Sequence, residues 1–432
     1  MSGTRTGELS RPGSERGRVL PRSLVVLPAV IAALGVTLAA LAGADGSPAW
    51  RTARVLVVIA VTGLGVWFTR LAGRGARGGT ALALGIVGTV VGAGVAAAHL
   101  KAGLGAAAVA AVIVLVTGLI LLIWGAVMLV RATPGWWRLL AIPVALALLW
   151  FVLFPLTVAV FATNRPPGAL GTATPASYGL AYRNVAFRTA DGVRLSAWYI
   201  PPRNGAAVLL LPGAGSTRAA VLGQGAVLAR HGYGALLLDG RGHGGSSGHT
   251  MDFGWWGGRD IAAALTFLGR QPGISPGKIA LLGESMGGEQ ALAAMGTDPR
   301  ISAVVGEGVT GQQLADHGWM THGVTGVLDT GMEWVQYTAA GLISGAPRPM
   351  SIPDAIRAAV PRPVLIIAGG AVTSEPIAAR WFRAASPATV RIWVVPHAGH
   401  TAGLAAAPQA WAAHVLSFLN TALLLARPGT AR

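Results

Sequence analysis

The sequence predicts an α/β fold, a mostly parallel eight-stranded sheet with helices on both faces, preceded by an all-α transmembrane region. Two observations predict it. Long apolar runs with few charges fill the first 165 residues, whereas short apolar runs alternate with helical stretches from residue 178 onward. Residues 1–165 contain 14 basic and 3 acidic residues, and the rest of the chain contains 19 basic and 13 acidic residues. The chain therefore joins a sparse, basic and apolar front part to a domain of ordinary composition.

Five apolar runs in the front part can each cross a bilayer, which takes about 20 mostly apolar residues per helix. The expected spans are residues 24–43, 50–69, 80–98, 104–130 and 139–162. Because none of them contains Asp, Glu or Lys, we expect anchoring rather than transport or proton relay. Their many small residues would allow close packing, and oligomerisation through these helices.

The arginines between the runs predict how the chain crosses the membrane. With five spans and a basic cytoplasmic tail over residues 1–23, the inner segments carry ten basic residues and the outer loops carry three. This agrees with the positive-inside rule. A polar linker over residues 164–177 then leads to a domain outside the cytoplasm, over residues 178–425, and a short tail over residues 426–432. Loss of the weak span 50–69 would reverse this orientation.

The formal net charge of +17 indicates a membrane partner rather than nucleic acid, because the arginines flank apolar runs. The absence of cysteine excludes disulfides and thiolate chemistry. No His-Glu-x-x-His arrangement is present, so we expect neither a metal nor a cofactor. We expect a multi-pass protein of the cell membrane.

The second half begins with a predicted hairpin, in which strands 182–189 and 193–200 are joined by Asp191-Gly192. Further strands and helices then alternate along the chain. The strands are expected at residues 207–211, 235–239, 279–282, 303–305, 364–368 and 391–395. The helices are expected at residues 216–231, 255–270, 286–295 and 408–425.

Gly283-Glu284-Ser285-Met286-Gly287 reads Gly-x-Ser-x-Gly and lies between a predicted strand and a predicted helix. Strand, sharp turn and helix are the context of a nucleophile elbow, in which a serine hydroxyl is exposed at the end of a sheet. The glycines allow the backbone to make that strained turn. Ser285 is therefore the candidate nucleophile.

In such sites an acid and then a histidine follow the serine along the chain. His400, after a late predicted strand, is the candidate general base, and His397 is the alternative. Glu375 is the candidate acid that orients the imidazole, because it is the only carboxylate between Pro363 and His400. Glu307, at the end of an earlier strand, is the alternative acid.

Two backbone N–H groups are candidates for binding an oxyanion. One belongs to Met286, directly after the serine, and the other to Ala214 in the glycine-rich turn after strand 207–211. Small residues in that turn would let a carbonyl oxygen approach the backbone. We assign His243, in a later glycine-rich turn, to loop structure rather than to chemistry.

These segments together resemble the α/β-hydrolase superfamily, in particular bacterial serine esterases and dienelactone-hydrolase-like members, over about residues 178–425. The resemblance is carried by four segments: Leu211-Pro212-Gly213-Ala214-Gly215, Asp239-Gly240-Arg241-Gly242-His243-Gly244, Gly283-Glu284-Ser285-Met286-Gly287-Gly288 and Gly399-His400. The chain departs from the family pattern in two places. Pro212 stands where His is usual, and Val372 stands where most relatives carry the acidic Asp.

The resemblance also implies a cap inserted at about residues 308–360. Large apolar side chains in this stretch would favour an apolar acyl group or pack the cap onto the core: Trp319, Met320, Met332, Trp334, Tyr337 and Met350.

The sequence thus predicts a membrane-anchored serine hydrolase that cleaves carboxylic esters through an acyl-enzyme. The expected substrate is a small-molecule or lipid ester. The alternatives are an acyltransferase or a peptidase that uses the same residues, or a non-catalytic membrane scaffold or sensor with a degenerate hydrolase domain. The missing aspartate favours the last of these.

Overall fold

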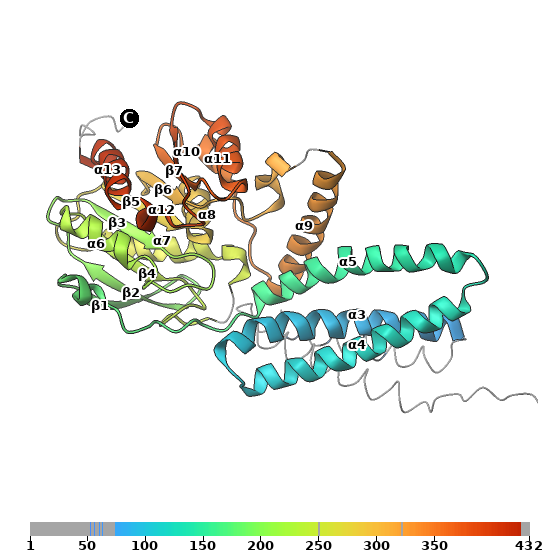
Figure 1. Cartoon of the computed structure of the whole chain (residues 1–432). Coiled ribbons are helices and arrows are strands. Elements are labelled where there is room, and N and C mark those ends of the chain that lie inside the picture. The colour runs from blue at the N-terminus through green and yellow to red at the C-terminus, as the bar shows by residue number, and fades with distance from the viewer. Residues whose placement is uncertain are drawn as a thin grey trace, which may run out of the picture.

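The computed structural model describes residues 74–248, 251–320 and 323–424, together with the isolated positions 52, 56, 60 and 63. Over these residues a group of long helices precedes an α/β domain (Figure 1). The expected span 24–43 and the two tails lie outside the described residues, as does nearly all of the expected span 50–69.

Three helices form the front part of the described chain: α3 (Arg74–His99), α4 (Ala106–Ala132) and α5 (Trp137–Thr163). Each is long and apolar enough to cross a membrane. They coincide with the third, fourth and fifth expected spans, and α3 begins six residues earlier than expected. Helices α3 and α4 lie side by side, with α5 packed along α3 (Figure 1).

The α/β domain is built on one eight-stranded sheet with the order β1-β2-β4-β3-β5-β6-β7-β8. Its strands are β1 (Arg183–Arg188), β2 (Arg194–Ile200), β3 (Ala207–Leu211), β4 (Gly234–Asp239), β5 (Ile279–Glu284), β6 (Ala303–Glu307), β7 (Val364–Gly369) and β8 (Val390–Val395). Strand β2 pairs antiparallel with both of its neighbours, and all other pairs are parallel. The predicted hairpin and all six later strands are present, with ends shifted by two residues at most.

Helices cover both faces of this sheet (Figure 1). They are α6 (Leu222–Arg230), α7 (Gly257–Leu268), α8 (Met286–Met295), α10 (Ile352–Ala359), α11 (Ser374–Ala385), α12 (Gly403–Ala406) and α13 (Pro408–Leu419), whereas α9 (Gly323–Ser344) lies beside the sheet and packs against α5. Short 3-10 turns lie between them, including η3 (Asp252–Gly254), η4 (Leu314–Asp316) and η5 (Gly318–Met320), and a π-helical turn follows α13 at Asn420–Leu424.

Alternation along the central strands divides the core in two. Leu209 of β3 belongs to the core cluster that includes residues of α7, α8, α10 and α11, whereas its neighbours Val208 and Leu210 belong to the cluster that includes residues of α6 and α13. Because successive side chains of a strand point to opposite faces, fully apolar strands are buried on both sides. This explains why β3 to β7 read as continuous apolar runs.

Helix α6 begins at Leu222, so the prediction of a helix from residue 216 was wrong for its first turn and a half. The preceding residues form turns instead, because the Arg218 N–H donates to Asp239 Oδ1 at 2.7 Å. The predicted helix 408–425 is also divided, since α13 ends at Leu419 before the π-helical turn.

Candidate active site

Ser285 stands in the sharp turn between β5 and α8, with φ of 50° and ψ of −122°. This backbone conformation is strained for a residue with a side chain, and such strain is typical of functional turns. Two glycines make the turn feasible. A Cβ on Gly283 would overlap the backbone of Gly287, and a Cβ on Gly287 would overlap that of Leu211 at the end of β3. The local sequence therefore presents the Ser285 side chain at the carboxyl edge of the sheet.

His400 connects Ser285 to a buried carboxylate. Its Nε2 lies 2.9 Å from Ser285 Oγ, and its Nδ1 lies 2.7 Å from Glu375 Oε1. Because a carboxylate only accepts, Nδ1 carries the proton and Nε2 is left to accept the serine proton. The hydrogen bond to Glu375 raises the pKa of His400, and partial burial opposes that effect. The structure thus brings the three predicted residues into one chain of hydrogen bonds.

Glu375 reaches His400 from the first turn of α11. Two successive turns carry the chain there from the end of β7, since the Val372 N–H donates to Gly369 and the Glu375 N–H donates to Val372. The side chain is 1% exposed, and its second oxygen accepts the Gly369 N–H at 2.7 Å. Its length allows the carboxylate to lie beside the histidine although it begins three residues beyond Val372.

Glu307, the alternative acid, has other partners. Its carboxylate accepts the Gly403 N–H at 2.7 Å and the Trp411 Nε1–H at 2.9 Å. Burial raises its pKa, and these two hydrogen bonds oppose the rise. No hydrogen bond joins it to His400 in the part of the chain that the structure describes. Glu307 instead ties the end of β6 to the segment that follows His400 along the chain.

His397 lies on an exposed turn with φ of 59°. It does not belong to the chain of hydrogen bonds around Ser285, which runs through His400. The two histidines therefore differ clearly in their surroundings.

The two predicted oxyanion donors come from neighbouring elements. Met286 is the first residue of α8, and Ala214 lies in the turn after β3, which is adjacent to β5 in the sheet. A Cβ on Gly213 would lie 3.3 Å from the Cβ of Ser285, so this turn touches the elbow. Over the described residues neither N–H donates to another protein group. First-turn N–H groups of a helix are free to bind an anion.

His243 supports the glycine-rich turn after β3, a contact that the sequence did not reveal. Its Nε2 accepts the Gly215 N–H at 3.1 Å, while its Nδ1 lies 2.8 Å from the Arg241 carbonyl oxygen and donates to it. Burial lowers the pKa of His243, which favours the neutral ring that this pairing requires. Arg241 is held in turn by Asp260 and Asp191, at 2.8 and 2.9 Å.

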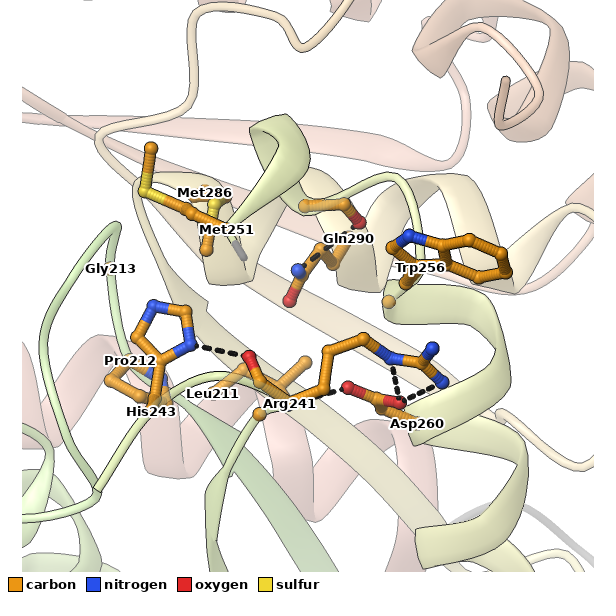
Figure 2. A pocket seen from close by; sticks show the side chains of 13 residues that line it. Leu211, Pro212, Gly213, Arg241, His243, Met251, Trp256, Asp260, Met286 and Gln290 are labelled. Carbon is orange, nitrogen blue, oxygen red and sulfur yellow. Dashed lines mark hydrogen bonds and ion pairs between the residues drawn. The ribbon is translucent and has the colours of Figure 1, made fainter. Parts of the chain in front are cut away.

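A small hollow of about 20 Å³ lies beside the elbow, between the glycine-rich turn after β3 and the start of α8 (Figure 2). Its lining is mostly apolar and comes from segments far apart in the sequence: Leu211, Pro212, Gly213, Gly240, Arg241, His243, Met251, Gly254, Trp256, Gly257, Asp260, Met286 and Gln290. The large apolar side chains noted at 308–360 do not line this hollow. Among the described residues no cluster of three or more His, Asp and Glu side chains could hold a metal.

Comparisons with known proteins agree with this fold. The family model for serine aminopeptidases (S33) matches residues 202–343. An uncharacterized protein of Mycobacterium tuberculosis is 31% identical over 226 residues, which cover 51% of this chain and 73% of that protein. A thiohydrolase of Aspergillus aculeatus is 33% identical over 135 residues, or 29% of this chain and 40% of that enzyme.

Among solved structures, an esterase of Pyrococcus furiosus superposes with a TM-score of 0.50 at 25% identity, covering 60% of this chain and 98% of the esterase. A sharp strand-turn-helix connection on a mostly parallel sheet is typical of hydrolases of the α/β class. The chain belongs to the α/β-hydrolase superfamily.

Proposed function

We propose that the protein is a membrane-anchored serine hydrolase that cleaves carboxylic esters through an acyl-enzyme. The observation that carries the proposal is the continuous chain of hydrogen bonds from Glu375 through His400 to Ser285. The similarity to the Pyrococcus furiosus esterase supports the choice of reaction, and three long apolar helices support the membrane anchor.

In this mechanism Ser285 Oγ attacks the ester carbonyl carbon while His400 Nε2 takes the hydroxyl proton. Glu375 keeps the proton on Nδ1 and stabilises the imidazolium that forms. The N–H groups of Ala214 and Met286 donate to the carbonyl oxygen as it becomes negative. His400 then protonates the leaving alcohol, and a water activated by the same histidine releases the acid and regenerates the serine.

The first test is labelling of membranes with a fluorophosphonate, comparing the wild type with Ser285→Ala. We expect labelling of the wild type alone, because only an activated serine reacts. Hydrolysis of p-nitrophenyl esters of increasing acyl length should likewise disappear in Ser285→Ala. An unlabelled wild type would reject the proposal in favour of a scaffold or sensor.

Unlabelled enzyme from the same preparation distinguishes the related reactions. Product analysis with an alcohol acceptor distinguishes acyl transfer from hydrolysis, and a peptide amide beside the matching ester distinguishes a peptidase. We expect the ester to be cleaved faster and water to be the main acceptor.

We further propose that the hydrolase domain lies outside the cytoplasm, on the basis of the distribution of arginines between the apolar runs. Since the chain contains no cysteine, Gln409→Cys on the exposed surface of α13 provides a unique label site. A membrane-impermeant maleimide should react with this variant in intact cells. Reaction only after lysis would indicate the opposite orientation.

A further inference from the structure

Helix α9 exposes an uncharged apolar face. Its large outward side chains recur at intervals of three, four and seven residues, so they share one side of the helix. They are Val324 (78% exposed), Val327 (69%), Leu328 (43%), Trp334 (58%) and Leu342 (66%). Gly331 lies on the same side, where a Cβ would meet open space. We call these residues the outer face of α9.

The opposite side of α9 carries polar groups toward the hydrolase domain. Glu333 Oε2 lies 2.8 Å from His317 Nδ1, although the carboxylate belongs to a helix with ample free surface. Tyr337 is buried, stacks on the His317 ring and packs edge-on against Phe253. A surface helix in water buries its apolar side and exposes its charges. Helix α9 departs from this rule, because its exposed side is also apolar and Glu333 is turned inward toward His317. The outer face is therefore poorly suited to contact with water.

The neighbouring helix identifies the medium. Helix α9 packs against the end of α5, where Ile343 joins the apolar cluster around Val160, and Tyr337 and Ala340 pack with Ala159. Figure 1 shows α9 meeting α5 close to the point at which α5 joins the hydrolase domain. Since α5 is long and apolar enough to cross a membrane, its end marks the depth of the lipid–water boundary. Trp334 is of a type that is enriched at that boundary.

We propose that α9 lies in the plane of the bilayer, with its outer face inserted among the lipids that surround α5. An amphipathic helix of this kind rests at the boundary between headgroups and acyl chains. Its inner face remains on the hydrolase domain through Tyr337 and Glu333. The occupant of the outer face is therefore lipid rather than another protein segment.

The position of α9 also suggests a route for substrate, an extension that rests on the proposed function. Tyr337 contacts Phe253 and Trp255, and the neighbouring residues Gly254 and Trp256 line the hollow beside Met286. A helix seated in lipid thus adjoins the wall of the site. An ester dissolved in the bilayer would reach that wall without crossing water.

The location of α9 is tested by spin labelling of the full-length protein in phosphatidylcholine vesicles. The natural absence of cysteine allows single labels at Val327→Cys and Gly331→Cys, with Gln409→Cys on α13 as the water-exposed control. In the bilayer both α9 labels should collide readily with oxygen and little with a nickel chelate, as a nitroxide-labelled lipid in the same vesicles does. The proposal would be overturned if the α9 labels collided with the nickel chelate as often as the label at Gln409→Cys. Exclusion of both reagents would also overturn it, because it would indicate cover by residues 24–69 or by a second copy.

The substrate route is tested by adding one charge to the outer face. Val327→Glu should lower the rate of hydrolysis of a long-chain ester held in vesicles by about tenfold or more. The rate on a soluble short-chain ester should stay unchanged. Ala358→Glu, which adds the same charge at an exposed position of α10, should change neither rate. Equal rates on vesicles for Val327→Glu and the wild type would overturn the route, as would an equal loss on both esters. If the wild type cleaves neither ester, the proposed function fails while the spin-label result stands by itself.

Discussion

The helical part and the sheet domain of this protein solve the same packing problem with different residues. Residues 74–163 contain no Asp or Glu, and α3 and α4 approach each other through glycines. A Cβ on Gly85, Gly92 or Gly118 would overlap the backbone of the facing helix. The sheet domain instead buries several carboxylates, each with hydrogen-bond partners, including Glu307 and Glu375.

This difference follows from what drives association in each medium. In water, apolar burial drives folding, and a buried carboxylate is tolerated where it is hydrogen bonded. Among lipids, apolar side chains gain little free energy by exchanging contacts with lipid for contacts with another helix. Close backbone contact through small residues therefore becomes important. A substitution that is severe in one part should therefore have little effect on the other. The following predictions test that separation, from the largest expected effect to the smallest.

Glu375→Gln should lower kcat by about 10³ to 10⁴-fold, because the amide cannot keep the correct proton on His400 or stabilise the imidazolium. The pH dependence gives a second readout. His400 must be neutral to accept the serine proton, and Glu375 raises its pKa. The acid limb of kcat/KM in the wild type should therefore lie above pH 6.5, and that of the residual activity in the variant should move to lower pH. An unchanged limb in Glu375→Gln would argue against this acid.

Gly92→Leu should destabilise the α3–α4 pair by about 1–3 kcal/mol or more, because the added side chain meets the backbone of Leu115. Gly79→Leu is the matched control on the same helix, since a Cβ there meets nothing within 4 Å. The midpoint of heat-induced aggregation in detergent should fall for Gly92→Leu alone. Fluorophosphonate labelling of Ser285 at 25 °C should be retained in both variants. Loss of labelling in Gly92→Leu would mean that the two parts are not independent.

Much of this organisation could be predicted from the sequence, and the exceptions share a cause. The strands could be predicted because apolar runs bounded by glycine or proline are local features. Ser285 and His400 could be proposed as site residues because each follows a predicted strand. The sequence favoured Glu375 as the acid but left Glu307 open as the alternative, since the partners of each carboxylate are remote in sequence. Trp411, whose Nε1–H donates a hydrogen bond to Glu307, lies 104 residues beyond it in the sequence.

The cap shows the same limit. The sequence indicated large apolar side chains between residues 308 and 360 but not which way they face. In the structure Trp334 is on the outer face of α9 and Tyr337 is on the inner one. Orientation of a helix depends on the surface it packs against, and that surface includes α5, more than 150 residues earlier in the chain.

Glu307→Gln should affect stability more than chemistry. The glutamine amide cannot accept both the Gly403 N–H and the Trp411 Nε1–H as the carboxylate does, so one buried donor loses its partner. We expect a loss of about 1–3 kcal/mol in the free energy of unfolding. The effect on kcat should stay below about tenfold, since Glu307 reaches the site only by positioning the segment after His400. Thermal unfolding and ester hydrolysis of the same preparation check both statements. A kcat loss as large as that of Glu375→Gln would restore Glu307 as the acid.

Glu284→Gln should have the smallest effect, which is a change in how the stability of the fold depends on pH. Glu284 is buried on β5 with Gln224 as its hydrogen-bond donor, and burial together with nearby Glu307 raises its pKa to about 8. The folded state therefore holds this proton more tightly than the unfolded state, whose pKa is near 4.5. The stability that follows is fully present below pH 4.5 and is lost as the pH rises toward 8.

A glutamine at position 284 does not titrate and can still accept from Gln224. The Tm of the variant should thus match the wild type near pH 5 and exceed it by a few degrees at pH 8.5. The matched comparison is Glu307→Gln, which removes a carboxylate whose two donors depend on it and should lower Tm at both pH values. A parallel pH dependence in Glu284→Gln and the wild type would show that Glu284 is ionised in the folded protein. The buried carboxylates of the sheet domain would then be held as charges throughout, which would make the contrast with the acid-free helices sharper still.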